Sequence, residues 1–134
     1  MIDETVNYHS GIRNYNRMLE GKRAFITTAA RGIGKSIAIL FARQGATVYF
    51  AGRNECYVRE TESELQLLAP ESRGYICDLA DGAQSEETAA LVLRDSGGID
   101  ILINTVGVNC HCAADGYKDE DMARLLETNY ISGL

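Results

Sequence analysis

Small residues between an apolar segment and a helical pattern are the first place where this sequence could do chemistry. Residues 24–27 are apolar or β-branched, as in a buried parallel strand, and residues 35–42 place apolar side chains at helical spacing. The turn between them contains Gly32 and Gly34, which let a pyrophosphate approach the backbone closely. The amino terminus of a helix offers unpaired N–H groups and a positive dipole end to phosphates. The pattern therefore predicts a nucleotide-binding turn, with an ordinary strand-to-helix turn as the alternative.

The end of the second predicted strand indicates which nucleotide would bind. Residues 47–51 form an apolar strand that ends at Gly52 and Arg53, with no acidic residue at that corner. In nucleotide-binding α/β folds, an acid here binds the ribose 2′-OH of NAD(H), whereas an arginine accommodates the 2′-phosphate of NADP(H). Arg53, and Arg31 in the first turn, therefore favour NADP(H) over NAD(H). Both are also typical of solvated surface arginines.

The rest of the chain alternates helices and strands, which predicts an α/β fold with a doubly wound parallel sheet. Asn54 is a predicted N-cap for the helix that follows it, and Gly45 a predicted left-handed helix end. We expect helices over 35–42, 55–68, 83–94 and 118–134, and strands over 24–27, 47–51, 74–77 and 99–104. The residues expected to face the core are Ile37, Leu40 and Phe41, then Val58, Leu65 and Leu68, then Ala89, Val92 and Leu93 or their neighbours, together with Cys77.

Composition and charge argue against several classes of function. The 134 residues suffice for one domain, the net charge of -6 is acidic, and no block of lysine and arginine is present, so no nucleic-acid partner is expected. No apolar run is long enough to cross a bilayer, so no membrane partner is expected. The first residues lack a signal-peptide pattern, and four cysteines are too few for a disulfide scaffold. These features predict a cytoplasmic protein.

A Cys-His-Cys group invites a metal-site interpretation. Cys110, His111 and Cys112 lie in a predicted loop over 108–114. A zinc site needs about four ligands, and the sequence offers no second pair to complete the set. We therefore expect no metal, and interpret this segment as a loop on the substrate side with free thiols.

The first turn carries a family resemblance. Residues 27–34 resemble the Thr-Gly-x-x-x-Gly-x-Gly fingerprint of the short-chain dehydrogenase/reductase family, with matches at Thr27, Gly32 and Gly34 and with Thr28 in place of the first glycine. A β-branched residue lacks the backbone freedom of glycine. Thr28 is therefore expected to narrow the cofactor groove or weaken binding, without abolishing it if its backbone conformation is an ordinary one.

A second motif follows the fourth predicted strand. The run Asn104-Thr105-Val106-Gly107 resembles the Asn-Asn-Ala-Gly signature of the same family, with departures at Thr105 and Val106. In the family this segment lies along the cofactor and ties the central strands together. Thr105 retains hydrogen-bonding capacity, so we expect the strand to persist.

The resemblance covers residues 19–134 almost continuously and implies roles for further residues. It places Asp78 and Leu79 at the adenine ring, with a helix-cap role as the alternative for Asp78. It matches Asn129 to a helix asparagine of the catalytic proton relay, with a polar residue bonding within its own helix as the alternative. The implied cofactor-binding residues are Thr28, Arg31, Gly32, Ile33, Gly34, Arg53, Asn54, Asp78, Leu79, Asn104, Val106 and Gly107.

The resemblance also sets expectations for organisation and activity. We expect an N-terminal arm over 1–18 and a Rossmann-like half-domain over 19–134, with about four parallel strands in the order 3-2-1-4. The phrase 125–129 is most similar to the 3-oxoacyl-acyl-carrier-protein reductase and sugar-alcohol dehydrogenase branches of the family. This similarity implies hydride transfer between NADP(H) and a small carbonyl or alcohol substrate, in a homo-oligomer.

The catalytic serine and Tyr-x-x-x-Lys pair of the family follow the helix that contains Asn129. None of the seven tyrosines in this sequence has a lysine four residues later. The pair supplies the general acid for carbonyl reduction. The chain is therefore expected to be the cofactor-binding part of such an enzyme or, alternatively, a truncated and catalytically inactive nucleotide-binding or association module.

Overall fold

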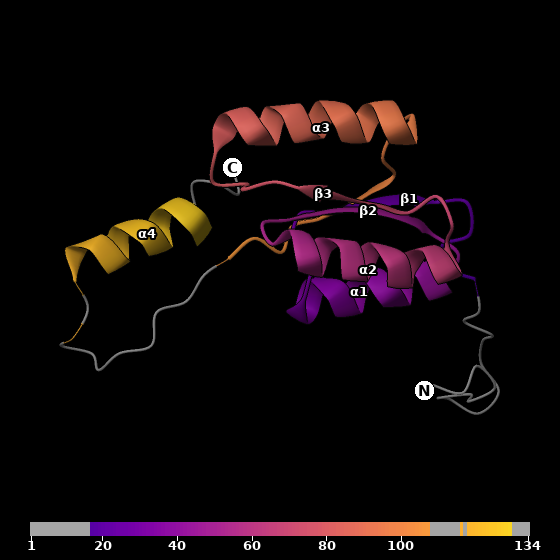
Figure 1. Cartoon of the computed structure of the whole chain (residues 1–134), viewed down its shortest axis with the longest axis horizontal. Coiled ribbons are helices and arrows are strands. Elements are labelled where there is room, and N and C mark those ends of the chain that lie inside the picture. The colour runs from indigo at the N-terminus through magenta and orange to yellow at the C-terminus, as the bar shows by residue number, and fades with distance from the viewer. Residues whose placement is uncertain (1–16, 108–115, 117, 130–134) are drawn as a thin grey trace.

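A four-stranded parallel sheet organises the protein, with helices on both of its faces. The computed structural model describes residues 17–107, 116 and 118–129. The strands run in the order β3-β2-β1-β4, as the sequence predicts, and α1 and α2 cover one face while α3 covers the other (Figure 1). The elements are β1 (Arg23–Ile26), α1 (Gly32–Arg43), β2 (Thr47–Gly52), α2 (Glu55–Leu68), β3 (Arg73–Ile76), α3 (Gly82–Ser96), β4 (Ile101–Ile103) and α4 (Asp119–Asn129).

The main core lies between the sheet and the layer formed by α1 and α2. Its centre contains Ile26, Val48 and Phe50 from the strands, all fully buried. Helix α1 turns the small residues Ala38 and Ala42 toward the sheet, so its backbone can pack closely. These two residues are one turn apart, and Leu40 falls on the opposite side at 100° per residue. The prediction that Leu40 faces the core is therefore wrong, because its side chain is half exposed.

The buried faces of α2 and α3 also differ in part from the predicted ones. In α2, Val58 and Leu65 are buried as predicted, but Thr61 lies between them and Leu68 is exposed. Thr61 can be buried there because its hydroxyl donates to a backbone carbonyl. The buried positions of α3 are Thr88 and Val92, whereas Ala89 and Leu93 are exposed. Three further predictions are confirmed, since Cys77 is buried, Asn54 caps α2, and Gly45 has a φ of 93°.

Strand β4 is shorter than predicted. Its backbone pairs with β1 only over Ile101–Ile103, whereas the sequence predicts a strand over 99–104. At the amino side, Asp100 instead accepts hydrogen bonds from the backbone N–H and the guanidinium of Arg23. At the carboxyl side, Asn104 bonds through its side chain. Backbone bonds also persist at both ends, from the N–H of Asp100 to the carbonyl of Arg23 and from the N–H of Thr27 to the carbonyl of Ile103, so the side-chain bonds supplement the ladder there.

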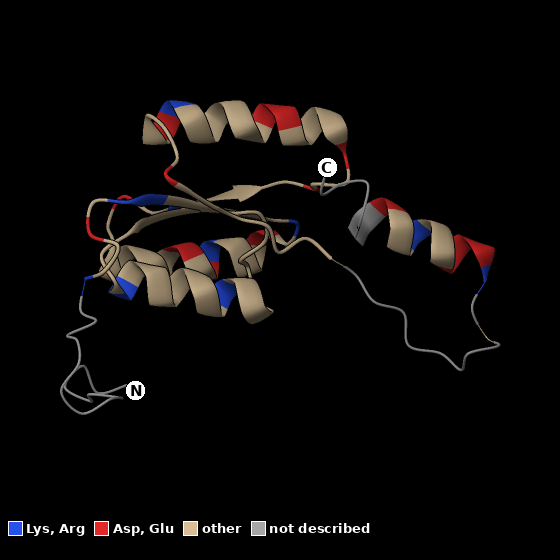
Figure 2. Ribbon diagram, turned by 180° about the vertical axis from the view of Figure 1, so that it is seen from behind, with Lys and Arg blue, Asp and Glu red and all other residues tan. Residues whose placement is uncertain are grey.

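Helix α4 stands beside the layered unit. Figures 1 and 2 show it to one side of the sheet from opposite directions, with acidic residues in its first turn. This placement of acids suits the positive end of the helix dipole. The predicted helix over 118–134 is confirmed for its described part. The rest of that helix, most of the predicted arm over 1–18, and Cys110, His111 and Cys112 lie outside the described residues.

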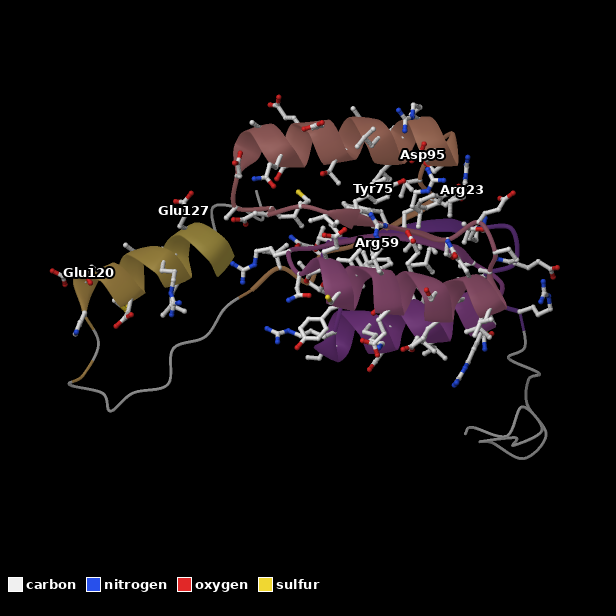
Figure 3. All side chains as sticks on the ribbon, in the orientation of Figure 1. Arg23, Arg59, Tyr75, Asp95, Glu120 and Glu127 are labelled. Atoms are coloured by element: carbon white, nitrogen blue, oxygen red, sulfur yellow. The ribbon has the colours of Figure 1, made fainter. Side chains whose placement is uncertain are left out.

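A polar cluster joins β3 to α3 on the other face of the sheet. Tyr75 extends from β3 toward α3, where Asp95 lies (Figure 3), and its hydroxyl donates to the carboxylate at 2.7 Å. Arg73 and Arg94 form ion pairs with the same carboxylate. The hydrogen bond from Tyr75, with those from the two arginines, lowers the pKa of Asp95 below its ordinary value of 3.8. Burial and the same bond raise the pKa of Tyr75.

We predict that Asp95→Asn makes the protein less sensitive to acid. A carboxylate whose pKa is lowered by folding adds stability above its unfolded pKa, and this stability is lost as the pH falls through the folded pKa. The unfolding temperature of the native chain should therefore drop below about pH 5, and the variant should show a shallower drop. Thermal unfolding followed by circular dichroism between about pH 2 and 6 measures both curves. Parallel curves would contradict this role of Asp95.

Candidate functional site

The turn between β1 and α1 lies at the carboxyl edge of the parallel sheet, where ligands bind in this class of fold. Gly32 has a φ of 65°, a left-handed conformation that favours glycine. The preceding residue, Arg31, has an extended backbone and no side-chain cap bond. Within the described part of the chain, the N–H groups of Gly32, Ile33 and Gly34 meet no acceptor. The first turn of α1 can therefore donate these groups to an anionic ligand.

Gly34 sets how closely α1 approaches the end of β1. A Cβ atom placed on Gly34 would lie 1.8 Å from the carbonyl oxygen of Thr28. No side chain can occupy that space without moving the backbone of the turn. The final glycine of the fingerprint is therefore required by packing, and it lets the helix amino terminus sit directly against the strand.

The backbone of β2 and a side chain of α2 fix one side of the turn. The N–H of Ala29 donates to the carbonyl of Ala51 at 3.2 Å, and the hydroxyl of Thr61 donates to the carbonyl of Ala30 at 2.9 Å. A Cβ on Gly52 would lie 2.8 Å from the Cβ of Ala30, so the turn also presses against the end of β2. Sequence reasoning missed Thr61, whose position in a helix gave no sign that it would reach the turn.

Arg31 and Arg53 lie at the corner between the first turn and the end of β2. The guanidinium of Arg31 sits 5.7 Å from the centre of the Tyr57 ring, within the range of a cation–π contact. Both arginines are exposed, and neither has a carboxylate partner among the described residues. The arginines that do form ion pairs are Arg17, Arg23, Arg59, Arg73 and Arg94.

Tyr57 is a second residue at this corner that sequence reasoning missed. Its N–H donates to the Oδ1 atom of Asn54 at 3.1 Å, which fixes the first turn of α2. The signal that could have found it is its place three residues after that N-cap, at the end of the helix nearest Arg31. The side-chain oxygen of Asn54 is thereby used in capping, although Asn54 was predicted from the resemblance as a cofactor-binding residue.

The segment after β4 is bound to the turn by side-chain hydrogen bonds. The hydroxyl of Thr27 accepts from the N–H of Thr105 at 2.8 Å and donates to the Oδ1 atom of Asn104 at 3.1 Å. The same Oδ1 atom accepts from the N–H of Val106 at 3.3 Å. Asn104 therefore ties the central strands together, as the resemblance implies, and Val106 and Gly107 follow at the same edge of the sheet.

Thr28 occupies the position of the missing glycine without strain. Among the described residues Arg17 is the one non-glycine residue with a positive φ, so the backbone of Thr28 has an ordinary conformation. Its hydroxyl donates to the carbonyl of Thr105 at 2.9 Å. The backbone of Thr28 therefore has the ordinary conformation under which Thr28 is expected not to abolish cofactor binding.

Asp78 and Leu79 lie just after β3, at the third strand end of the same edge. One carboxylate oxygen of Asp78 accepts from the N–H of Ala80, and the carbonyl of Leu79 accepts from the hydroxyl of Ser85. The N-cap of α3 is Asp81, which accepts from the N–H groups of the two residues at 83 and 84. A cap role for Asp78 is thus wrong, and its carboxylate stays at the strand end.

Two surface cavities compete as ligand sites. A cavity of about 720 Å³ adjoins the amino terminus of α1 and is lined by Gly32, Ile33 and Lys35, among others. A second, of about 570 Å³, lies between α2 and α3 beside β3. The arginines of the second cavity are already paired with carboxylates. The lining of the first cavity includes Gly32 and Ile33 but neither Arg31 nor Arg53. The candidate site is therefore assigned from the free N–H groups of the turn and the two unpaired arginines, and not from a cavity.

Asn129 is not brought into this site. It is the last residue of α4, which stands apart from the layered unit (Figure 1), and its side chain is outside the described set. No group of three metal-ligating residues occurs among the described residues. In the same part of the chain, none of the helices combines the length and apolar character needed to cross a membrane.

A comparison of the sequence with profiles of protein families identifies the family of this chain. The profile described as short chain dehydrogenase matches residues 22–134. The chain belongs to the short-chain dehydrogenase family. The matched range includes the glycine turn, the four strands and the segment Asn104–Gly107.

Known relatives cover most of this chain. It is 32% identical to 3-oxoacyl-[acyl-carrier-protein] reductase of Thermotoga maritima, over 83% of this chain and 45% of that protein. It is 38% identical to 2,3-dihydro-2,3-dihydroxybenzoate dehydrogenase of Bacillus subtilis, over 83% and 42%. A solved 3-ketoacyl-(acyl-carrier-protein) reductase from Brucella melitensis, complexed with NADH, is 26% identical with a TM-score of 0.76, over 86% of this chain and 46% of that one. The chain thus spans less than half the length of these relatives.

We predict that Gly34→Ala disrupts the site. The added methyl group would overlap the carbonyl of Thr28, so the turn must shift, at a cost of about 3 kcal/mol in unfolding free energy. Nucleotide binding should weaken at least about tenfold, since the N–H groups move with the turn. Chemical unfolding and calorimetric titration measure the two effects.

The matched control is Gly82→Ala at the start of α3. A Cβ on Gly82 meets nothing within 4 Å, and its φ is not positive. This variant should stay within about 1 kcal/mol of the native chain and bind nucleotide normally. Equal effects of the two substitutions would contradict the packing role of Gly34.

Proposed function

We propose that these residues form the NADP(H)-binding part of a short-chain oxidoreductase. The observation that carries the proposal is the pair of exposed arginines, Arg31 and Arg53, which have no carboxylate partner among the described residues. They flank the end of β2, where this class of fold meets the ribose 2′ position. No acidic residue stands at that strand end to favour a free 2′-OH. Two unpaired guanidinium groups suit a 2′-phosphate.

The remaining candidates would follow the cofactor along the carboxyl edge of the sheet. The free N–H groups of Gly32, Ile33 and Gly34 would hold the pyrophosphate. Asp78 and Leu79, after β3, would meet the adenine, and the carboxylate can accept from the exocyclic amine. The segment Asn104–Gly107 would support the middle of the cofactor, including Val106. When bound, the nicotinamide would supply or accept a hydride.

The site residues assigned here bind and orient the cofactor. The activity proposed for the enzyme is hydride transfer between the nicotinamide and a small carbonyl or alcohol substrate, by analogy with the relatives. The printed sequence has no tyrosine followed four residues later by lysine. We therefore assign proton donation to none of its tyrosines. Asn129 keeps the proton-relay role that the resemblance implies, as a proposal.

A second proposal is a nucleotide-binding or association module without turnover. The observation that favours it is Leu102 in β4, whose side chain is 65% exposed at one end of the described strand order. An apolar edge strand promotes pairing with another chain, which would suit a homo-oligomer. Steady-state carbonyl reduction by the purified 134-residue chain would rule this proposal out. We also propose a cytoplasmic location, since Cys56 and Cys77 are free thiols.

We predict that the chain prefers NADPH to NADH and that the two arginines cause this preference. Arg31→Ala and Arg53→Ala should each weaken NADPH binding about tenfold, because each removes a charge-assisted hydrogen bond to the 2′-phosphate. NADH binding should change less than about twofold, because NADH lacks that phosphate. Fluorescence titration with both cofactors measures the affinities.

The control for this prediction is Arg43→Ala. Arg43 is an exposed arginine at the other end of α1, so its removal makes the same change in net charge away from the site. It should leave both affinities unchanged. Equal affinity of the native chain for NADPH and NADH would contradict the assignment of the arginines to a 2′-phosphate.

A further inference from the structure

Thr28 departs from the first family motif and Thr105 from the second, and the two residues lie opposite each other. The register of β1 and β4 pairs Ala24 with Ile101 and Ile26 with Ile103. The same offset, extended by two residues, pairs Thr28 with Thr105. Side chains at paired positions of neighbouring parallel strands lie on the same side of the sheet. The two departures therefore meet in space.

Three hydrogen bonds join the two threonines. The N–H of Thr28 donates to the Oγ1 atom of Thr105 at 3.0 Å. The hydroxyl of Thr105 donates to the carbonyl of Thr28 at 2.7 Å. The hydroxyl of Thr28 donates to the carbonyl of Thr105 at 2.9 Å. Each hydroxyl has one proton, so these three bonds account for both hydroxyls, and the 3.0 Å approach of the two Oγ1 atoms adds no further bond.

These bonds continue the sheet beyond its last backbone pair. The N–H of Thr27 still donates to the carbonyl of Ile103 at 3.0 Å. Beyond this point the hydroxyls of Thr27 and Thr105 act as the acceptors in place of carbonyls. The ladder between β1 and β4 thus extends by two residues, up to the point where the chain leaves for α1 on one strand and for Gly107 on the other.

The carbonyl of Thr28 also packs against α1. This is the oxygen against which Gly34 lies, since a Cβ on Gly34 would approach it to 1.8 Å. The hydroxyl of Thr105 holds the same oxygen from the other side. The position of the α1 amino terminus relative to β4 therefore depends on Thr105.

We propose that Thr28 and Thr105 form a paired positioning element, here named the threonine latch, which fixes the distance between the phosphate-binding turn and the segment Asn104–Gly107. A dinucleotide that spans both parts would meet a groove of fixed length, whereas a ligand that touches only the turn would not depend on the latch. The latch compensates for the lost glycine, because the Thr28 hydroxyl is held against Thr105 instead of projecting into the groove. The identity of the ligand rests on the proposed function, but the latch itself does not.

Thr28 and Thr105 contribute different numbers of hydrogen bonds through their hydroxyls, so substitutions at the two positions should differ in the size of their effects. Thr105→Val removes two of the three bonds and leaves the N–H and carbonyl of Thr28 without their partners. Thr28→Val removes one bond. Thr28→Ser and Thr105→Ser keep the hydroxyls and should behave like the native chain. Thr47→Val in β2 is the control, because no side-chain hydrogen bond of Thr47 occurs within the described residues.

The first readout is hydrogen exchange of the Thr28 amide, measured by NMR on the 134-residue chain without ligand. Thr105→Val should speed this exchange at least about tenfold, because the amide loses its acceptor. Thr47→Val and Thr105→Ser should not change it. Unchanged exchange in a folded Thr105→Val protein would overturn the latch. If Thr105→Val does not fold while Thr105→Ser does, the comparison is made with Thr28→Val, which removes the donor to the Thr105 carbonyl. Its Thr105 carbonyl carbon shift and its melting temperature should then differ from those of Thr28→Ser, and equal values would overturn the latch.

The second readout separates positioning from simple stability. At a temperature where the variants are folded, loss of the latch should weaken binding of NADPH about fivefold or more. Binding of adenosine 2′,5′-bisphosphate, which carries only the adenosine half, should change less than about twofold. Equal losses for both ligands would overturn the positioning role. A native chain that binds neither ligand would contradict the proposed function, while the exchange result would still decide whether the latch exists.

Discussion

The contact between Gly34 and the carbonyl of Thr28 is the constraint on which the rest of the site depends. It brings the amino terminus of α1 directly against the end of β1, closer than any side chain allows. This approach aims the unpaired N–H groups of the first helical turn at the carboxyl edge of the sheet. The small buried residues Ala38 and Ala42 extend the close packing along the helix. The groove is therefore a consequence of how near this helix can lie to the sheet.

The candidate site is positively charged, although the protein as a whole is negatively charged. The chain carries a net charge of -6, yet the corner formed by Arg31 and Arg53 has two guanidinium groups with no carboxylate partner among the described residues. Five other arginines form ion pairs, two of them with Asp95, whereas Arg43 and Arg124 also lack a carboxylate partner among the described residues. Leaving two cations unpaired at one strand end costs little in water and provides a ready counter-charge for a phosphate.

Much of the fold could be predicted from the sequence, because buried parallel strands and glycine turns leave local patterns. The capping by Asn54 and the left-handed Gly45 follow from such patterns, whereas the strand order follows from the family resemblance. The core faces of the helices were harder, because Leu40 and Leu93 are apolar but exposed while Thr61 and Thr88 are polar but buried. Hydrophobicity alone cannot report a buried hydroxyl that finds a backbone partner.

The candidate site was predictable in its parts but not in its connections. Its glycines and arginines stand in one turn and at one strand end, so the sequence indicates them directly. The pairing of Thr28 with Thr105 crosses 77 positions and shows only in the register of β1 with β4. Each threonine alone reads as a departure from a motif. In the folded chain each hydroxyl donates to the carbonyl of the other residue.

The most direct test of this account is to map the ligand by NMR, titrating the isotopically labelled chain with NADPH and following its backbone amides. We predict the largest shifts at Gly32, Ile33 and Gly34, with further shifts at Arg53 and in the segment Asn104–Gly107. Shifts concentrated instead in the cavity between α2 and α3, around Arg73 and Arg94, would contradict the assignment of the site.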